Sequence, residues 1–410
     1  MELIAPAGNL EKLKAAVRFG ADAVYCGAGS YSLRAPETSF SIADLAEGVQ
    51  FAHDHQCKVY LAMNIFAFDE DIAGMLVYFD QAACLGIDAV IVSDPGIIAQ
   101  VRRRSNAIRI HLSTQANTTN SESARFWREQ GVDRIVAARE LSLARIGEIR
   151  KRVPDMELEV FVHGAMCIAY SGRCLLSKFM SDRSANRGLC AQPCRWEYQL
   201  EESVSGEKQT IEQDLHGTYI LNSRDLCMIG HIPELAAAGV DSLKIEGRMK
   251  TAYYTAMVTR VYRAALDSYL KSPENYRFDP RWLEELKSVS HRPYTTGFYL
   301  PDREDETECI TDSSPIRGYD FVGTADLHDR QANILTIRAR NRFAVGDILE
   351  IIDPDHHEVL TIKVGEITDT QSGKSMAEAH NSYVVDVSLG GSCDHLIGKD
   401  AMIRRVGVYL

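Results

Sequence analysis

The stretch GVDSLKIEG (239–247) follows a design that also occurs three times earlier in the chain, and this design decides the fold. The earlier copies are GADAVYCG (20–27), GIDAVIVSD (86–94) and GVDRIVAAR (131–139). In each copy a helical pattern ends at a glycine, which can close a helix in the left-handed conformation, and an apolar run rich in β-forming residues follows. Each copy therefore predicts a helix that leads into a buried strand.

Four more short apolar runs lie between these copies. They are LIAPA (3–7), KVYLAMN (58–64), RIHLSTQ (109–115) and LEVFVHG (158–164). Continuous apolar strands that alternate with helices predict a parallel sheet covered by helices. Eight such units favour an α/β fold of the TIM-like (β/α)8 barrel type, although an open sheet uses the same units. In such a barrel the functional site lies at the carboxyl ends of the strands.

The length of 410 residues exceeds the ~250 to 300 at which a single core stops growing, so a second domain is expected. We place the barrel at residues 1–270, with a Cys-rich insertion at 164–217 after the seventh strand. Residues 271–310 are expected to form a partly helical linker. Residues 311–410 alternate apolar and polar side chains between Gly and Asp turns, which predicts a small all-β barrel domain, with a sandwich as the alternative.

The composition limits where the protein works and what it binds. Lys and Arg number 45 against 57 Asp and Glu, a formal net charge of −12, so nucleic acid would have to meet a local basic patch. The start MELIAPAG lacks the basic and apolar regions of a signal peptide, and no stretch reaches the ~20 apolar residues of a membrane span. We expect a cytoplasmic protein, in which the ten cysteines stay reduced.

The strongest chemical signal is the stretch HGAMCIAYSGRCLLSKFMSDRSANRGLCAQPCRWEY (163–198). Its cysteines, Cys167, Cys174, Cys190 and Cys194, have the spacing C-x6-C-x15-C-x3-C. A structural zinc site pairs two knuckles of the C-x2–4-C type, whereas an iron–sulfur cluster accepts looser spacing, so we favour a [4Fe–4S] cluster. A radical-SAM motif is excluded, because Glu197 stands where its third cysteine should be.

The remaining cysteines are scattered along the chain. Cys26, Cys57 and Cys84 lie in strand or helix patterns and are expected to pack in the core, and Cys309 and Cys393 are isolated.

The same stretch is the basic part of an acidic chain. Asp182 is its only acidic residue between positions 173 and 195, where the basic residues are Arg173, Lys178, Arg183, Arg187 and Arg195. We predict that these side chains attract RNA or another anion. The alternative is that they only balance the negative charge of a thiolate cluster.

Polar residues at the strand ends are the candidates for the catalytic site. They are His111, Gln115 and Asn117 around the fifth strand, Arg139 after the sixth, His163 after the seventh, and Glu246 and Arg248 after the eighth. Some polar residues at strand ends cap helices or fill polar layers instead, which we expect of Ser93, Asp94 and Glu140. A cysteine protease could use His163 as the base for Cys167, but proximity in sequence does not establish a hydrogen bond.

The sequence resembles peptidase family U32, the collagenase-like proteins, over nearly the whole chain. The resemblance is carried by ELIAPAGNLEKLKAAVRFGADAVYCG (2–27), HLSTQAN (111–117), EVFVHGAMCIAYSGRCLLS (159–177), CRWEY (194–198), HGTYILNSRDL (216–226) and SLKIEGRMK (242–250). The subgroup most similar in these motifs is that of the tRNA hydroxylation proteins, which take part in forming 5-hydroxyuridine at the wobble position.

The resemblance implies a tRNA-modifying enzyme that hydroxylates uridine without O₂ and depends on a [4Fe–4S] cluster. The implied cluster ligands are Cys167, Cys174, Cys190 and Cys194, with Cys227 in reserve. Prephenate is the implied hydroxyl donor and co-substrate. The alternatives are a collagenase-like peptidase and an enzyme that hydroxylates rRNA or another aromatic substrate.

The expected partners follow from this function. A flipped-out uracil and a small dicarboxylate would enter the barrel mouth, and an arginine would bind carboxylate. The basic Cys-rich stretch and the C-terminal barrel would hold the tRNA anticodon stem–loop, with Tyr170 and Trp196 as candidates for stacking on bases. A dimer with a second copy or with a paralogue is also expected, and no membrane is involved.

Overall fold

A computed structural model of the chain describes residues 1–33, 39–167, 169–195, 213–214, 217–218, 224–300, 319–356, 358–390 and 396–406. The chain divides into two compact units. The first comprises Met1–Val17, Ala21–Leu283 and His291–Pro315, and the second comprises Arg18–Gly20, Glu284–Ser290 and Ile316–Leu410. Among the described residues, no helix is both long enough and apolar enough to cross a membrane.

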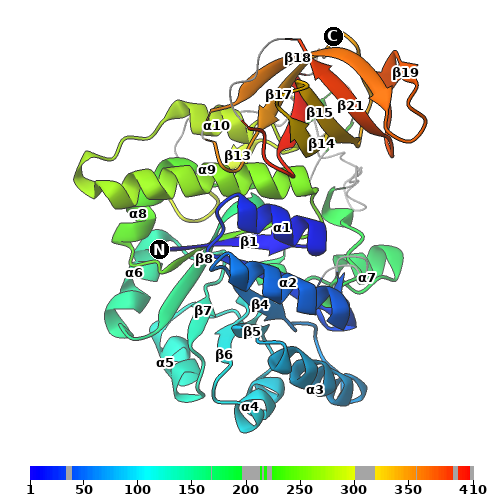
Figure 1. The fold of residues 1–410 in the computed structure, drawn as a ribbon. Helices are drawn as coiled ribbons and strands as arrows, with labels where there is room; N and C mark the ends of the chain where they lie inside the picture. The colour runs from blue at the N-terminus through cyan, green and yellow to red at the C-terminus, as the bar shows by residue number, and fades with distance from the viewer. Residues whose placement is uncertain are drawn as a thin grey trace. The chain divides into compact units, whose positions relative to one another are not determined.

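The first unit is a closed parallel barrel of the eight predicted strands (Figure 1). They are β1 (Glu2–Ala7), β2 (Ala23–Ala28), β4 (Lys58–Ala62), β5 (Ala89–Val92), β6 (Arg109–Leu112), β7 (Arg134–Val136), β8 (Glu157–Ala165) and β12 (Ser242–Ile245). Each strand pairs in parallel with the next, and β12 pairs with both β8 and β1. This second pairing closes the ring, so the prediction of a barrel rather than an open sheet is confirmed.

The four glycines of the repeated design end helices as predicted. Gly20, Gly86, Gly131 and Gly239 have φ angles of 98°, 87°, 83° and 75°. Glycine adopts such angles at no steric cost because it has no Cβ. In every copy the chain therefore turns sharply from a helix into the following strand.

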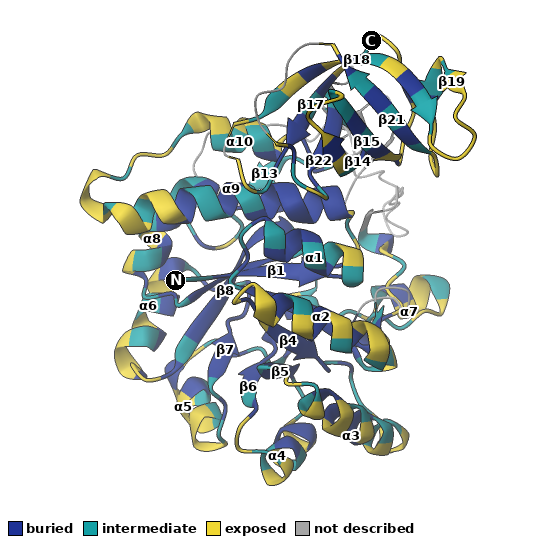
Figure 2. Ribbon diagram, in the orientation of Figure 1, coloured by how far each residue is buried: buried dark blue, intermediate teal, exposed yellow. Residues whose placement is uncertain are grey.

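Helices cover the outside of the barrel and bury the faces that they turn toward the strands (Figure 2). They are α1 (Leu10–Arg18), α2 (Ile42–Asp54), α3 (Asp69–Cys84), α4 (Pro95–Arg104), α5 (Ser121–Glu129), α6 (Leu143–Arg152), α8 (Ile232–Ala237) and α9 (Ala252–Lys271). Asp94 caps α4, because its Oδ1 accepts a hydrogen bond from the backbone nitrogen of Ile97 at 2.9 Å, as predicted. Cys84 ends α3 and is exposed, so the expectation that it packs in the core is wrong.

The interior of the barrel contains a layer of paired charges. Arg134 donates hydrogen bonds to Glu2 and, at 3.3 Å, to Glu159. Glu2 also accepts from the hydroxyl of Tyr60 at 2.7 Å, and Glu159 accepts from the ammonium of Lys244 at 2.7 Å. Removing one partner of a buried ion pair costs about 3 to 5 kcal/mol, so these side chains depend on one another.

Two short strands extend the sheet beyond β8. β11 (Asp225–Cys227) runs antiparallel to the end of β8, and β13 (Tyr294–Thr295) pairs in parallel with β11. The stretch that we expected to be a linker thus contributes a strand to the barrel unit, and it also contains α10 (Pro280–Leu286). Shorter elements of the described chain are β3 (Ser39–Phe40), β9 (Gln213–Asp214) and β10 (Gly217–Thr218).

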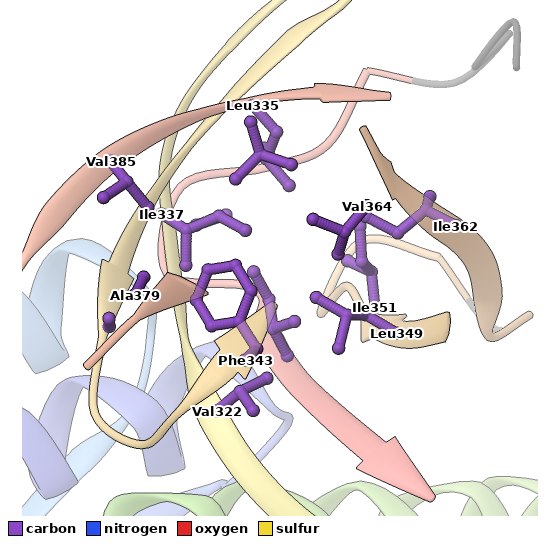
Figure 3. Close-up of a cluster of buried hydrophobic side chains, with 14 of the residues drawn as sticks. Val322, Leu335, Ile337, Phe343, Leu349, Ile351, Ile362, Val364, Ala379 and Val385 are labelled. Carbon is purple, nitrogen blue, oxygen red and sulfur yellow. The ribbon is translucent and has the colours of Figure 1, made fainter. Parts of the chain in front are cut away.

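The second unit is a small antiparallel barrel, as predicted. Its closed ring of neighbours is β17 (Ile348–Ile352), β22 (Met402–Val406), β14 (Tyr319–Asp329), β15 (Ile334–Ala339), β21 (Val384–Leu389) and β18 (Leu360–Asp369). Short β16 (Phe343–Ala344), β19 (Ser375–Met376) and β20 (Glu378–Ala379) flank it. Figure 3 shows aliphatic side chains from these strands gathered around the buried ring of Phe343.

Candidate functional site

A pocket of about 340 Å³ opens at the carboxyl ends of the barrel strands. This volume falls within the range of about 300 to 1,000 Å³ that small-molecule sites occupy. Strand residues form what we call the floor: Tyr25, Ala62, Ile91, Val136, Phe161 and Lys244. Loops that follow the strands contribute Asn64, Ser113, Thr114, Gln115, Arg139, and the stretch from Glu246 to Lys250. The barrel therefore places the site where its fold class predicts.

Most of the remaining wall of the pocket comes from residues 167 and 169–195, which we call the Cys segment. It contains α7 (Leu176–Ser181) and several turns of 3₁₀ helix. Cys167, Cys174, Cys190 and Cys194 all line the pocket, and none of them forms a disulfide. Within the described chain, no three His, Cys, Asp or Glu side chains come together closely enough to hold a single metal ion. The four cysteines thus line one pocket.

An arginine anchors the Cys segment to the first turn of α3 and to the loop that precedes it. The guanidinium of Arg187 donates to both oxygens of Asp71, at 2.7 and 3.0 Å, and to the carbonyl of Phe66 at 3.1 Å. It also lies over the ring of Phe68, 4.7 Å from the centroid. The hydrogen bond from Arg187 lowers the pKa of Asp71. Because this geometry is bidentate, Arg187 fixes both the position and the direction of the segment.

A second anchor joins the Cys segment to the loops after β6 and β7. Glu140 accepts hydrogen bonds from the backbone nitrogen and the hydroxyl of Ser171, at 2.6 and 2.8 Å. Arg173 donates through Nε to the carbonyl of Gln115 at 2.7 Å. We expected Glu140 to cap a helix or fill a polar layer, whereas the structure shows that it holds the turn between the first two cysteines.

These anchors divide the basic residues of the Cys segment by role. Arg173 and Arg187 bind groups of the protein itself, and Lys178 pairs with Asp182 on an exposed surface. Arg183 is exposed, lines the pocket and pairs with no carboxylate of the described residues. The side chain of Arg195 lies outside the described residues. Of the five predicted anion-binding side chains, Arg183 is thus the one that the structure places at the pocket.

The pocket is positively charged within an acidic protein. Its charged lining residues are Arg139, Arg183, Lys244, Arg248 and Lys250, against the single carboxylate of Glu246. Arg139 lies 4.0 Å from the ring centroid of Phe161 and 3.6 Å from Glu246. An excess of cations in a partly enclosed site attracts carboxylates and phosphates.

Two glycines allow the loop after β12 to approach the barrel. Arg248 donates through Nη1 to the hydroxyl of Ser32 at 3.2 Å, and its carbonyl accepts from Lys12 at 3.2 Å. A Cβ at Gly27 would lie 2.6 Å from that Nη1, and a Cβ at Gly8 would overlap the carbonyl of Arg248. The glycines of the motifs APAGN and YCGAG therefore make room for Arg248.

Two predicted histidines do not line the pocket. His111 lies on β6, two residues before Ser113, and is completely buried. Its ring packs edge-on against the ring of Tyr60, with 4.6 Å between the centroids. Burial lowers its pKa well below the usual value. His163 lies near the rings of Tyr254 and Tyr262 on α9, and burial lowers its pKa to about 3. Both imidazoles are therefore neutral near pH 7.

The other sequence-based candidates are divided between the pocket and its surroundings. Gln115, Arg139, Glu246 and Arg248 line it, whereas Asn117 lies beyond a 3₁₀ turn at φ 53° and does not. The reserve ligand Cys227 is buried on β11 away from the pocket, and burial raises the pKa of its thiol to about 11. Tyr170 is exposed on the Cys segment, and Trp196 lies outside the described residues, as do Cys309 and Cys393.

Several pocket residues were not among our candidates. Tyr25, Ser113, Lys244 and Lys250 line it, together with Asn64, whose place at the end of the third strand we had noted. Lys244 could have been predicted from the sequence. A lysine in the middle of the apolar run SLKI is costly to bury unless it has a partner, so its presence there indicates a special role.

Comparison with known proteins places this geometry in a family. The chain is 40% identical to tRNA hydroxylation protein P1 of Bacillus subtilis (strain 168) over 404 residues, which cover 98% of this chain and 94% of that protein. It is 37% identical to tRNA hydroxylation protein P of Escherichia coli (strain K12), with 88% of each chain covered. The 23S rRNA 5-hydroxycytidine synthase of Escherichia coli (strain K12) is 35% identical over 66% of this chain and 40% of its own length.

Solved structures and family models complete the comparison. The structure of the U32 peptidase Mk0906 is 16% identical, with a TM-score of 0.41, and covers 60% of this chain and 93% of its own. The model of peptidase family U32 matches residues 8–308, and the model of the family's C-terminal domain matches residues 317–404. With these matches over both units, the chain belongs to peptidase family U32.

Proposed function

We propose that this protein is an RNA hydroxylase that converts the wobble uridine of tRNA to 5-hydroxyuridine in the cytoplasm, without O₂. One observation carries the proposal: four cysteines and an excess of basic side chains line the same pocket. The names of the two tRNA hydroxylation relatives support a tRNA substrate. The name of the rRNA relative supports hydroxylation at carbon 5 of a pyrimidine.

The four thiols suit an iron–sulfur cluster better than a zinc ion. A structural zinc site pairs two knuckles of the C-x2–4-C type, and of the four cysteines only Cys190 and Cys194 have that spacing. An iron–sulfur cluster accepts looser spacing between its ligands. Cys167, Cys174, Cys190 and Cys194 would hold the cluster, which supplies electron transfer when it is bound. Nearby Arg183 and Lys250 would offset the negative charge of the thiolates.

The pocket offers separate surroundings for the two expected ligands. The floor is largely apolar and aromatic, which suits a flipped-out base. Arg139, Arg248 and Lys250 follow the strands and suit the carboxylates of a small donor such as prephenate. In the net reaction a donor R–OH and the C5–H of uracil give R–H and C5–OH. Uracil loses two electrons and the donor gains them, so O₂ is not consumed.

The described residues do not bring together the catalytic pair that the peptidase alternative needs. A cysteine nucleophile needs a base within hydrogen-bonding distance, and no histidine of the described residues lines the pocket. His163 is turned toward tyrosines of α9, and burial lowers its pKa to about 3, which makes it a weak base. Hydroxylation of rRNA remains a second candidate function, because the rRNA relative matches the barrel part of the chain.

Mass spectrometry of nucleosides from a strain that lacks this protein tests the proposal. We expect 5-hydroxyuridine to disappear from tRNA and to return with the wild-type gene but not with Cys190→Ala. Cys84→Ala is the matched control, because Cys84 is exposed on α3 outside the pocket, and it should restore the nucleoside fully. Unaltered tRNA with a changed rRNA digest would favour the second candidate, and unaltered digests of both would refute RNA hydroxylation.

A further inference from the structure

One amide on the pocket wall has hydrogens without an acceptor. The side chain of Gln115 is buried and lines the pocket, and its Oε1 accepts a hydrogen bond from the hydroxyl of Ser113 at 3.2 Å. Within the described chain its Nε2 has no hydrogen-bond partner. A buried amide nitrogen without a partner is costly, so an acceptor is expected to meet it when the pocket is occupied.

A chain of hydrogen bonds fixes which end of this amide is the nitrogen. The backbone nitrogen of Leu33 donates to Oδ1 of Asn64 at 3.2 Å, so the other end of the Asn64 amide must be its NH₂ group. That group donates to the hydroxyl of Ser113 at 3.1 Å. Ser113 has a single hydroxyl hydrogen, which is then directed at Gln115. The amide of Gln115 therefore accepts from Ser113 through oxygen and keeps both N–H groups for a ligand.

Lys244 supplies a second set of donors on the floor. Its ammonium donates to Oε1 of Glu159 at 2.7 Å, the one hydrogen bond it makes among the described residues. The same ammonium lies over the rings of Tyr25 and Phe161, 4.5 and 5.5 Å from their centroids, and both rings line the pocket. An ammonium carries three hydrogens, so two remain. Glu159 offsets the charge of Lys244, and this lets the floor accept a neutral ligand.

The carboxylate that lines the pocket is already engaged. Glu246 lies 3.6 Å from Arg139, and the hydroxyl of Tyr25, which donates to the carbonyl of Ile245 at 3.0 Å, lies 3.5 Å from it. The fixed groups of Gln115 and Lys244 at the strand ends are thus donors.

We propose that Gln115 and Lys244 determine which pyrimidine the pocket accepts, by donating hydrogen bonds to its carbonyl oxygens. This inference rests on the proposed function. Uracil has a carbonyl at carbon 4, next to the carbon that is hydroxylated, whereas cytosine has an amino group there. A donor that faces an amino group leaves both groups unpaired. Gln115 and Lys244 together therefore select uridine over cytidine.

Binding of two anticodon stem–loop RNAs to the full-length protein tests this selection. The RNAs are identical except for uridine or cytidine at the wobble position. We expect the wild type to bind the uridine RNA about tenfold more tightly, as one hydrogen bond and one avoided mismatch allow. Gln115→Glu keeps the shape and replaces the donor by an acceptor, so the preference should vanish or reverse. Ser113→Ala releases the amide, which should reduce the preference.

Two further variants separate specificity from folding and from charge. Gln115→Leu removes the donors without adding a charge and should abolish the preference while the melting temperature stays close to that of the wild type. Gln192→Glu adds the same negative charge at an exposed residue that lines the pocket, and it should weaken the binding of both RNAs equally. The inference would be overturned if the wild-type protein bound both RNAs equally, or if a folded Gln115→Glu variant still preferred the uridine RNA. Neither result would refute the proposed function, because that function is tested by the nucleoside digests.

Discussion

The carboxylate of Glu140 accepts two hydrogen bonds from Ser171, one from its backbone nitrogen at 2.6 Å and one from its hydroxyl at 2.8 Å. Ser171 has a φ of 46°, a conformation that is unfavourable for a residue with a side chain. Glu140 thus holds a strained turn between Cys167 and Cys174, and it connects the barrel to the segment that carries these two cysteines.

Removing this carboxylate should destabilise the turn. We expect Glu140→Ala to lower the free energy of unfolding by about 1 to 3 kcal/mol, because a partly buried N–H loses its acceptor. The measurement is urea unfolding of the purified protein. Glu148→Ala, which removes an exposed carboxylate on α6, should leave the unfolding midpoint nearly unchanged. Equal midpoints for both variants would show that Glu140 does not hold the turn.

Iron content should depend on the four pocket cysteines alone. Protein purified without air should be brown and should bleach with dithionite, and each of Cys167→Ser, Cys174→Ser, Cys190→Ser and Cys194→Ser should lower its iron content sharply. Cys227→Ser should keep the iron, because Cys227 does not line the pocket. Loss of iron in that variant together with retention in Cys194→Ser would move the fourth ligand to Cys227.

The buried histidines should make stability fall in mild acid. The pKa of His163 is lowered to about 3, so between about pH 6.5 and 3 the unfolded chain binds a proton that the folded chain does not. The free energy of unfolding should then fall by up to about 1.4 kcal/mol per pH unit for this residue. His111 acts in the same direction. Urea unfolding of His163→Gln should show a shallower slope over this range than the wild type, and an unchanged slope would contradict the burial of His163.

Adding one methyl group at Gly27 should displace Arg248, one of the cationic residues that line the pocket. A Cβ at position 27 would lie 2.4 Å from Oγ of Ser32 and 2.6 Å from Nη1 of Arg248, so these two buried side chains would have to shift. We therefore expect Gly27→Ala to fold but to bind prephenate several-fold more weakly, measured by isothermal titration calorimetry. At Gly230 a Cβ meets no atom within 4 Å, so Gly230→Ala should bind prephenate like the wild type. Equal affinities for the two variants would indicate that Arg248 does not contact the donor.

The fold could be predicted from the sequence because each strand and each turn has a local cause. Gly20, Gly86, Gly131 and Gly239 end helices at the predicted positions, and the apolar runs that follow become the parallel strands. The polar layer inside the barrel could not be predicted in this way. Arg134 and Glu159 lie in mainly apolar runs, and their partners come from strands that are distant in the sequence.

The site was predicted in part, for a reason that lies in strand geometry. Side chains alternate along a strand, so His111 and Ser113, which are two residues apart, point to the same side. Ser113, after the end of β6, reaches the pocket, whereas His111 lies one layer deeper and is buried. On β8 the register against β12 shifts, because Lys244 pairs with Phe161 but Ile245 pairs with His163. The extra residue, Val162, turns His163 away from the interior where Phe161 points. A sequence pattern does not reveal such a bulge.

Because of this bulge, the number of residues at the end of β8 determines where the first cysteine of the pocket lies. Deleting or inserting one residue between Phe161 and Cys167 would exchange inward and outward positions and carry the first thiol away from its three companions. Natural variants of the family should therefore tolerate changes of length in surface loops far more readily than within these few positions.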